Sequence, residues 1–526
     1  SLHTCPFMSL LFLLLSSILH SSQSAVFPVV TTSFGSIRGY EFTNQGGFTA
    51  QIFKKLPFAS PPVGPLRWKK PVNPEKWSET IDGTFFGPAC AQRTIMYDGP
   101  STGFSEDCLH LNVYSSQLCI QSKSCPVLFI IHGGLGIYEA TMKFPDEVLV
   151  TNFVSQGLVV VTTAYRVEAF GIMALGDENA LPANLAMHDV LAALKFTRSE
   201  IHSFGGDKDQ ITIMGHSTGA QIALHFAFSP GISPPGKPRL FRSVISMSGP
   251  SGLETEERQV ERSHMVAAKL NCSGSAREII DCMRPKSTDE ILTAASTVQT
   301  WNIFANIGLV GITMAGELMP IRSAKEMIEN NEPLRLMLGT TLYEVIGPGE
   351  KNDVNKVMGI ENDKECFAKY TRDRESDTFV PGYNTDAQAI IMTAYTYGKA
   401  QAESGGEVYL YEYDYPEHAT HTDDAYLVLG FHPYDKDSNE EWLSRVYPRY
   451  FANFAKGDRP APDWYQLKPN LMNYYSVYRN ETSDASPHMK FGYRSEITSY
   501  YTEMMEYDQR LTSVKRKVLN APVQYH

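Results

Sequence analysis

The chain has 526 residues, of which 43% are hydrophobic and 20% charged, a composition typical of a folded globular protein. It carries 46 basic and 58 acidic residues, a formal net charge of −12. Nucleic acids and anionic membranes bind basic surfaces, so this acidic excess argues against both as partners. We find no repeat at solenoid or propeller periods and no linker that divides the chain.

The first segment in chain order is an apolar stretch from Leu10 to Leu19, followed by Ser22-Gln23-Ser24. The stretch is too short to span a bilayer, and the small residues after it are typical of signal-peptidase cleavage. We therefore expect a secretion signal at 1–24, a single domain at 25–515 and a C-terminal tail at 516–526. No other segment has about 18 consecutive apolar residues, so no membrane span is predicted.

Secretion favours disulfides. Cys5 belongs to the predicted signal, which leaves seven cysteines. Short-range pairing predicts three bridges: Cys90–Cys108, Cys119–Cys125 and Cys272–Cys282. Cys366 is left over, as a buried thiol or an intermolecular partner. Asn271 and Asn480 begin glycosylation sequons, which also suit a secretory route.

Short apolar, β-branched runs alternate with helical patterns along the rest of the chain. Six runs predict buried strands, at 127–131, 158–163, 211–214, 243–247, 334–338 and 408–413. Apolar residues at helical spacing lie between the second and third of these runs. Such alternation predicts an α/β fold with a mainly parallel sheet flanked by helices on both faces. The stretch from about 250 to 333 is helical in pattern, and we expect it to form an excursion above the sheet.

The strand predicted at 211–214 is followed by Gly215-His216-Ser217-Thr218-Gly219. In a nucleophile elbow, strand and helix pack so closely that small residues are needed two before and two after the serine. A plain turn would not need both glycines. We therefore predict that Ser217 is a nucleophile, with the N–H of Thr218 beside its Oγ at a helix start.

A serine nucleophile needs a base, and the base needs a carboxylate that fixes its tautomer. His418 and His421 both follow the strand predicted at 408–413, so the residues alone leave both as candidates. Glu344 follows the strand predicted at 334–338 and is the candidate acid. The glycine-rich run 132–136 follows the strand predicted at 127–131, where backbone N–H groups can converge on a developing oxyanion.

These motifs together resemble the type-B carboxylesterase and cholinesterase family of α/β-hydrolases, from about Val26 to about Met505. The resemblance rests on the motifs SEDCLHLNVY, HGGLG, TAYRVEAFG, FGGDKDQITIMGHSTGA, GTTLYE, HTDDAYLVLG and YFANFAKGDRP. It implies an α/β-hydrolase fold, with a central, mostly parallel twisted sheet flanked by helices and a helical excursion over the site.

The resemblance also implies roles for single residues. Ser217 corresponds to the nucleophile, Glu344 to the acid and His421, rather than His418, to the base. The oxyanion donors would be the N–H groups of Gly134, Leu135 and Thr218. The resemblance further supports the bridges Cys90–Cys108 and Cys272–Cys282 and suggests structural ion pairs Arg67–Glu106 and Arg166–Asp189. It also suggests that Ser248 supports the triad without taking part in the reaction.

Several positions depart from the family pattern. Leu135 replaces a third glycine, His216 and Thr218 replace the usual glutamate and alanine of the elbow, and Tyr343 replaces an aspartate. None of these changes removes a reacting group. True cholinesterases carry a tryptophan between the first two disulfide cysteines for contact with choline. Between Cys90 and Cys108 this chain has only Tyr97 and Phe104 as aromatics, which argues against a cholinesterase.

The favoured interpretation is a secreted serine carboxylesterase that hydrolyses small-molecule esters and needs no metal or cofactor. One alternative is an acyltransferase that passes the same acyl group to an alcohol or amine. The other is a non-catalytic binding protein resembling the neuroligins, which usually lack part of the triad. The natural ester and the oligomeric state do not follow from the sequence.

Overall fold

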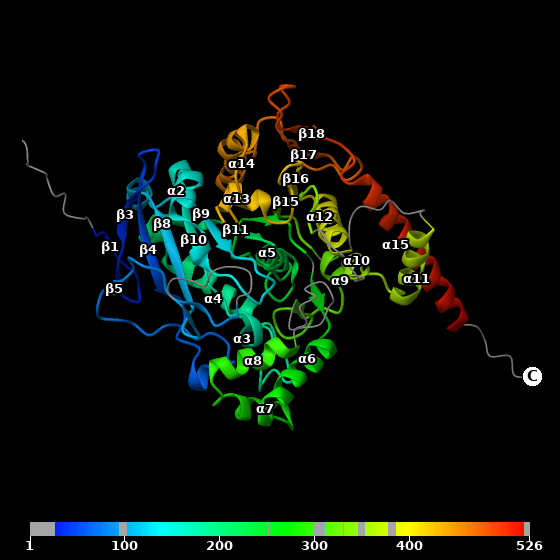
Figure 1. The fold of residues 1–526 in the computed structure, drawn as a ribbon, viewed down its shortest axis with the longest axis horizontal. Helices are drawn as coiled ribbons and strands as arrows, with labels where there is room; N and C mark the ends of the chain where they lie inside the picture. The colour runs from blue at the N-terminus through cyan, green and yellow to red at the C-terminus, as the bar shows by residue number, and fades with distance from the viewer. Residues whose placement is uncertain are drawn as a thin grey trace, which may run out of the picture.

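A computed structural model describes residues 27–93, 103–250, 252–298, 311–329, 331–345, 353–376 and 385–519. The predicted signal at 1–24 and Tyr97 lie outside these residues. A mixed sheet of 11 strands runs through the middle of the molecule, in the order β18-β17-β16-β15-β12-β11-β9-β10-β8-β4-β3. Helices lie on both sides of it (Figure 1). This is the predicted α/β-hydrolase arrangement.

The six predicted strands all form and are mutually parallel neighbours. Their bounds are β9 (Cys125–Ile131), β10 (Val159–Thr163), β11 (Gly206–His216), β12 (Ser243–Met247), β15 (Arg335–Thr341) and β16 (Glu407–Tyr413). The flanking strands are β3 (Tyr40–Thr43), β4 (Thr49–Pro57), β8 (His110–Ser115), β17 (Tyr474–Val477) and β18 (His488–Lys490). β3, β4 and β8 join one edge in antiparallel pairs, and β18 closes the other edge antiparallel to β17.

Side chains alternate between two cores along each strand, because successive residues of a strand face opposite sides. On β9, Phe129 belongs to one core and Ile130 to the other; on β16, Leu410 and Tyr411 do the same. One core is covered by α4 (Leu185–Glu200), α5 (Thr218–Phe228) and α12 (Thr385–Glu403), and the other by α2 (Asp146–Asn152), α13 (Asp423–Leu429) and α14 (Ser438–Lys456). Coverage of both faces explains why the buried parts of these strands are mostly apolar on both sides. The start of β11, with the exposed Lys208 and Asp209, is the exception.

The excursion predicted at 250–333 contains α6 (Glu256–Lys269), α7 (Ala276–Met283), α8 (Thr288–Val298) and α9 (Ala324–Glu329). Helices α6 to α8 gather at one end of the molecule (Figure 1). The segment is not wholly helical, since β13 (Leu253–Glu254) and β14 (Ile312–Thr313) form a short parallel pair. Helix α8 packs against α3 (Glu168–Gly171), whose Glu168 N–H donates to the Gly136 carbonyl of the glycine-rich run.

The remaining strands and α-helices are short, apart from α11 and α15. They are β1 (Val29–Thr31), β2 (Ser36–Arg38), β5 (Ile81–Asp82), β6 (Ala89–Cys90), β7 (Phe104–Ser105), α1 (Gln117–Ser122), α10 (Asp353–Met358), α11 (Asp363–Glu375) and α15 (Ser495–Leu519). Because α15 continues to Leu519, the predicted tail at 516–526 begins inside a helix. Among the described helices, none is both long and apolar enough to cross a membrane.

The three predicted disulfides are present as Cys90–Cys108, Cys119–Cys125 and Cys272–Cys282. Each closes a short loop, as near-neighbour pairing predicts. Cys366 is a buried free cysteine, and burial raises the pKa of its thiol to about 11. Of the two roles left open for Cys366, burial favours the inert thiol over an intermolecular partner.

Candidate active site

Ser217 lies at the sharp turn between β11 and α5. Its φ of 55° and ψ of −124° are unusual for a residue with a side chain. The turn depends on both flanking glycines: a Cβ on Gly215 would overlap the backbone of Gly219, and a Cβ on Gly219 would overlap the carbonyl of Ile131. The sequence therefore places two glycines here because strand, turn and helix leave no room for a side chain.

Three side chains from three different loops meet at this turn. The Nε2 of His421 lies 2.9 Å from the Oγ of Ser217, and its Nδ1 lies 2.7 Å from Oε2 of Glu344. Glu344 follows β15 and His421 follows β16, at the carboxyl ends of the parallel strands, where open α/β sheets place their ligands. We call this arrangement the Ser217–His421–Glu344 relay.

Glu344 is completely buried and held in one orientation by other donors. Its Oε1 accepts hydrogen bonds from the Ser248 hydroxyl at 2.7 Å and from the Thr341 N–H at 2.8 Å. Its backbone carbonyl accepts the N–H of His421 at 3.1 Å. Ser248, which was expected to support the triad, therefore contacts the candidate acid.

Burial lowers the pKa of His421, but the hydrogen bond to Glu344 and its charge outweigh that effect, so the pKa is raised above its usual 6.5. Asp424 and Glu139 contribute in the same direction. The imidazole is thus prepared to hold a proton next to Ser217.

His418, the other histidine that the residues left open, lies elsewhere. Its Nδ1 is 2.8 Å from Glu440, and its ring stacks on Tyr434 at 4.0 Å. These contacts join its loop to the start of α14. The residues alone left both histidines open and the family resemblance selected His421, which is the histidine that the structure brings to Ser217.

The glycine-rich run 132–136 packs directly against the serine turn. A Cβ on Gly133 would lie 2.9 Å from the carbonyl oxygen of His216 and 3.2 Å from the Cβ of Ser217. Gly134 has a φ of 93° and Leu135 a φ of 59°. Leu135 thus occupies the left-handed region that favours glycine, which agrees with a glycine in the family pattern.

Two further features near the site did not emerge from the sequence. His216 is buried beside His421, with its Nε2 2.7 Å from the His421 carbonyl oxygen. Glu139, which is also buried, pairs with Lys143 behind the glycine-rich run. The replacement of the usual glutamate by His216 in the elbow was the sequence signal that could have predicted the contact between His216 and His421. No local sequence pattern predicts the pair between Glu139 and Lys143.

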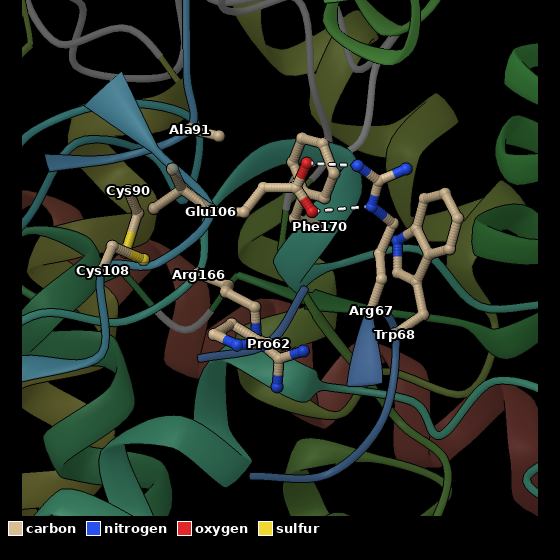
Figure 2. A pocket seen from close by; sticks show the side chains of 10 residues that line it. Pro62, Arg67, Trp68, Cys90, Ala91, Glu106, Cys108, Arg166 and Phe170 are labelled. Carbon is tan, nitrogen blue, oxygen red and sulfur yellow. Dashed lines mark hydrogen bonds and ion pairs between the residues drawn. A yellow bond between two sulfur atoms is a disulfide. The ribbon is translucent and has the colours of Figure 1, made fainter. Parts of the chain in front are cut away.

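The predicted ion pairs stabilise the fold and do not belong to the candidate active site. Glu106 accepts two hydrogen bonds from Arg67 beside the Cys90–Cys108 bridge (Figure 2). Arg67 also donates to the carbonyls of Arg284 and Lys286, which fastens the excursion to the rest of the fold. The cavity here, of about 10 Å³, has room for about one water molecule and none for an ester.

Comparison with known proteins agrees with this architecture. A model of the carboxylesterase family matches residues 26–500. The chain belongs to the carboxylesterase family. A medium-chain fatty acyl-CoA hydrolase precursor of Anas platyrhynchos is 28% identical over 499 residues, covering 85% of this chain and 87% of the relative. Carboxylesterase 1C of Rattus norvegicus is 28% identical over 504 residues, covering 83% and 87%.

Another relative is a juvenile hormone esterase of Tribolium castaneum, 35% identical over 285 residues. That match covers 52% of this chain and 47% of the relative. A gut esterase of Caenorhabditis briggsae gives a similar match, with 49% of its length covered. The chain therefore spans about half the length of these two relatives, and most of the length of the duck and rat proteins.

Proposed function

We propose that this protein is a secreted serine carboxylesterase that hydrolyses small-molecule carboxylic esters. The observation that supports this most is the Ser217–His421–Glu344 relay, whose two hydrogen bonds of 2.9 and 2.7 Å join nucleophile, base and acid without a gap. A serine hydroxyl is a weak nucleophile unless such a base lies within hydrogen-bond reach.

In the proposed reaction, the Oγ of Ser217 attacks the ester carbonyl carbon while Nε2 of His421 accepts the hydroxyl proton. Glu344 stabilises the imidazolium that forms. The N–H groups of Gly134, Leu135 and Thr218 would donate to the oxyanion, and each such donor is worth roughly 3 to 4 kcal/mol in comparable enzymes. Leucine keeps its backbone N–H, so Leu135 retains a donor where the family has glycine.

The tetrahedral intermediate collapses when His421 returns the proton to the leaving alcohol. The C–O bond to the alcohol breaks, and the acyl group stays on Ser217. Water then attacks the acyl-enzyme with His421 again as base, which releases the carboxylic acid and regenerates the hydroxyl.

The secretory route is part of the proposal. Three disulfides are typical of a chain that folds in an oxidising compartment. We accordingly propose a cleaved signal at 1–24, a single hydrolase domain from 25 to 515 and glycans on Asn271 and Asn480. Asn271 is exposed and Asn480 partly exposed, which suits such modification.

The test is turnover of p-nitrophenyl acetate and butyrate by secreted protein, with fluorophosphonate labelling in parallel. Ser217→Ala should abolish both signals. Ser444→Ala, which removes a surface hydroxyl on α14, is the matched control and should keep them. Folded wild-type protein that neither reacts nor labels would refute the proposal and favour a binding protein. Acyl transfer to added alcohols in place of hydrolysis would identify a transferase.

A further inference from the structure

A buried pair of opposite charges lies directly behind the glycine-rich run. The Nζ of Lys143 is 2.8 Å from Oε1 of Glu139, and the two side chains are 10% and 6% exposed. The Nε2 of His432 lies 3.9 Å from the same carboxylate oxygen. Burial alone would raise the pKa of Glu139, but His432 and Lys143 outweigh it and lower that pKa to about 2. Glu139 is therefore an anion throughout the physiological range.

The second carboxylate oxygen of Glu139 approaches the serine turn. The Oε2 of Glu139 lies 3.5 Å from the position that a Cβ on Gly133 would take, and that position is 3.2 Å from the Cβ of Ser217. Lys143 pairs with the other carboxylate oxygen, Oε1. The charge of Glu139 also adds to the effects of Glu344 and Asp424 that raise the pKa of His421 against the effect of burial.

The backbone of residue 139 does not need the carboxylate. Gln92 holds this backbone from both sides, accepting the Glu139 N–H at 2.8 Å and donating to the Glu139 carbonyl at 2.8 Å. The φ of Glu139 is 87°, a conformation that glycine adopts at lower cost. A glycine would thus serve the turn better, and the side chain calls for another explanation.

We infer that Glu139 and Lys143 act as a compensated charge pair that sets the electrostatic field at Ser217 and His421. This inference rests on the proposed ester hydrolysis. The transition state carries an imidazolium and an oxyanion, which have opposite signs. Glu139 favours the imidazolium, and Lys143 limits the repulsion between Glu139 and the oxyanion. Such fields act strongly in a partly buried site, where the effective dielectric constant is well below that of water.

Other ionisable groups surround both residues and are the same residues in every variant below. Burial raises the pKa of Asp424 to about 7, so its charge changes within the pH profile of the wild type and of each variant alike. His421 faces Glu344, Asp424 and His216 in addition to Glu139. Glu139 faces Lys143, His432 and His132. Burial lowers the pKa of His216 to about 3 and that of His132 to about 4, so both are neutral at working pH.

The test measures kcat/KM and kcat for p-nitrophenyl butyrate against pH in Glu139→Gln, Lys143→Met and the double variant. Glu139→Gln removes a negative charge near His421, so the acidic limb of kcat/KM should shift to lower pH by roughly 0.5 to 1 unit. Lys143→Met should shift the limb to higher pH and lower the kcat plateau about tenfold, because Glu139 then faces the oxyanion without the compensating charge of Lys143. The double variant should recover a plateau within about threefold of the wild type.

Two controls separate charge from structure. Lys369→Met breaks an ion pair with the same i, i+4 spacing on α11 and should leave the limb in place. Lys143→Arg keeps the positive charge and should keep the limb near the wild-type position. If Lys143→Met does not fold, the direction in which Glu139→Gln shifts the acidic limb of kcat/KM tests the inference by itself, and a shift to lower pH is the expected result.

Opposite shifts with recovery in the double variant support the inference. Shifts of the same sign, or no shift in Glu139→Gln, in folded and reactive protein would overturn the inference and leave the proposed function intact. A wild-type protein that neither turns over esters nor labels with fluorophosphonate would overturn both.

Discussion

The Nε2 of His216 donates a 2.7 Å hydrogen bond to the backbone carbonyl of His421. A carbonyl only accepts, and burial lowers the pKa of His216 to about 3, so the neutral ring carries its single proton on Nε2. The two rings also lie 5.0 Å apart, centre to centre. His216, the residue before Ser217, therefore holds the loop that carries His421, the proposed base.

The first prediction concerns this hydrogen bond. His216→Phe keeps a ring against Phe431 but removes the donor, and we expect kcat/KM to fall about tenfold, the value of one buried hydrogen bond. His216→Gln places an amide N–H near the same point and should recover most of the loss. Steady-state kinetics and the rate of fluorophosphonate labelling measure both variants. Equal losses in the two, with equal melting temperatures, would contradict a role for the donor.

The second prediction concerns pH. His421 must be neutral to accept the proton of Ser217, and its pKa is raised above 6.5 by Glu344 once the opposing effect of burial is included. Activity should therefore fall as the pH drops through a value above 6.5. A kcat/KM profile between pH 5 and 9 locates this limb. Glu344→Gln removes the charge and should move the limb downward while lowering kcat on the order of a thousandfold or more. A wild-type limb below pH 6 would refute the prediction.

The third prediction concerns Leu135, whose φ of 59° is unfavourable for any residue with a Cβ. Leu135→Gly should relax this loop and enlarge the space near the proposed oxyanion site, so longer acyl chains should react relatively faster. Leu135→Ala shortens the side chain but keeps the Cβ, and separates the two effects. The measurement is kcat/KM for p-nitrophenyl esters from acetate to decanoate. An unchanged chain-length profile in both variants would show that Leu135 does not limit the acyl group.

The fourth prediction concerns the buried ion pair between Arg166 and Asp189. Asp189 is fully buried and accepts two hydrogen bonds of 2.7 Å from the Arg166 guanidinium and a third from its backbone N–H. Asp189→Ala leaves a buried cation without a partner and should cost about 3 to 5 kcal/mol of stability. Thermal unfolding measures the loss. Asp82→Ala breaks the exposed pair with Arg38 and is the control, for which at most about 1 kcal/mol is expected.

The sequence predicted what depends on neighbours in the chain. The runs that became β9, β10, β11, β12, β15 and β16 are apolar on both sides because each of these strands is covered on both faces. Gly215 and Gly219 marked the turn because two glycines at fixed spacing around a serine form a local pattern, although the group that excludes a side chain at Gly219 is the carbonyl of Ile131 on β9. The three disulfides followed from short spacing, since closing a short loop brings two cysteines together at small entropic cost.

Tertiary structure decided what depends on residues far apart. His421 meets Ser217 across 204 residues and Glu344 across 77, distances at which local patterns carry no information on contact. The residues alone did not separate His418 from His421, and only the packing of α14 gives His418 a different partner. The approach of Glu139 to Gly133 was equally invisible, because it depends on how the loop after β9 folds back against the serine turn. The positions of strands, helices and turns along the chain were thus determined by local periodicity and steric constraints. The charges that surround Ser217 and His421 were determined by how the loops after different strands pack together.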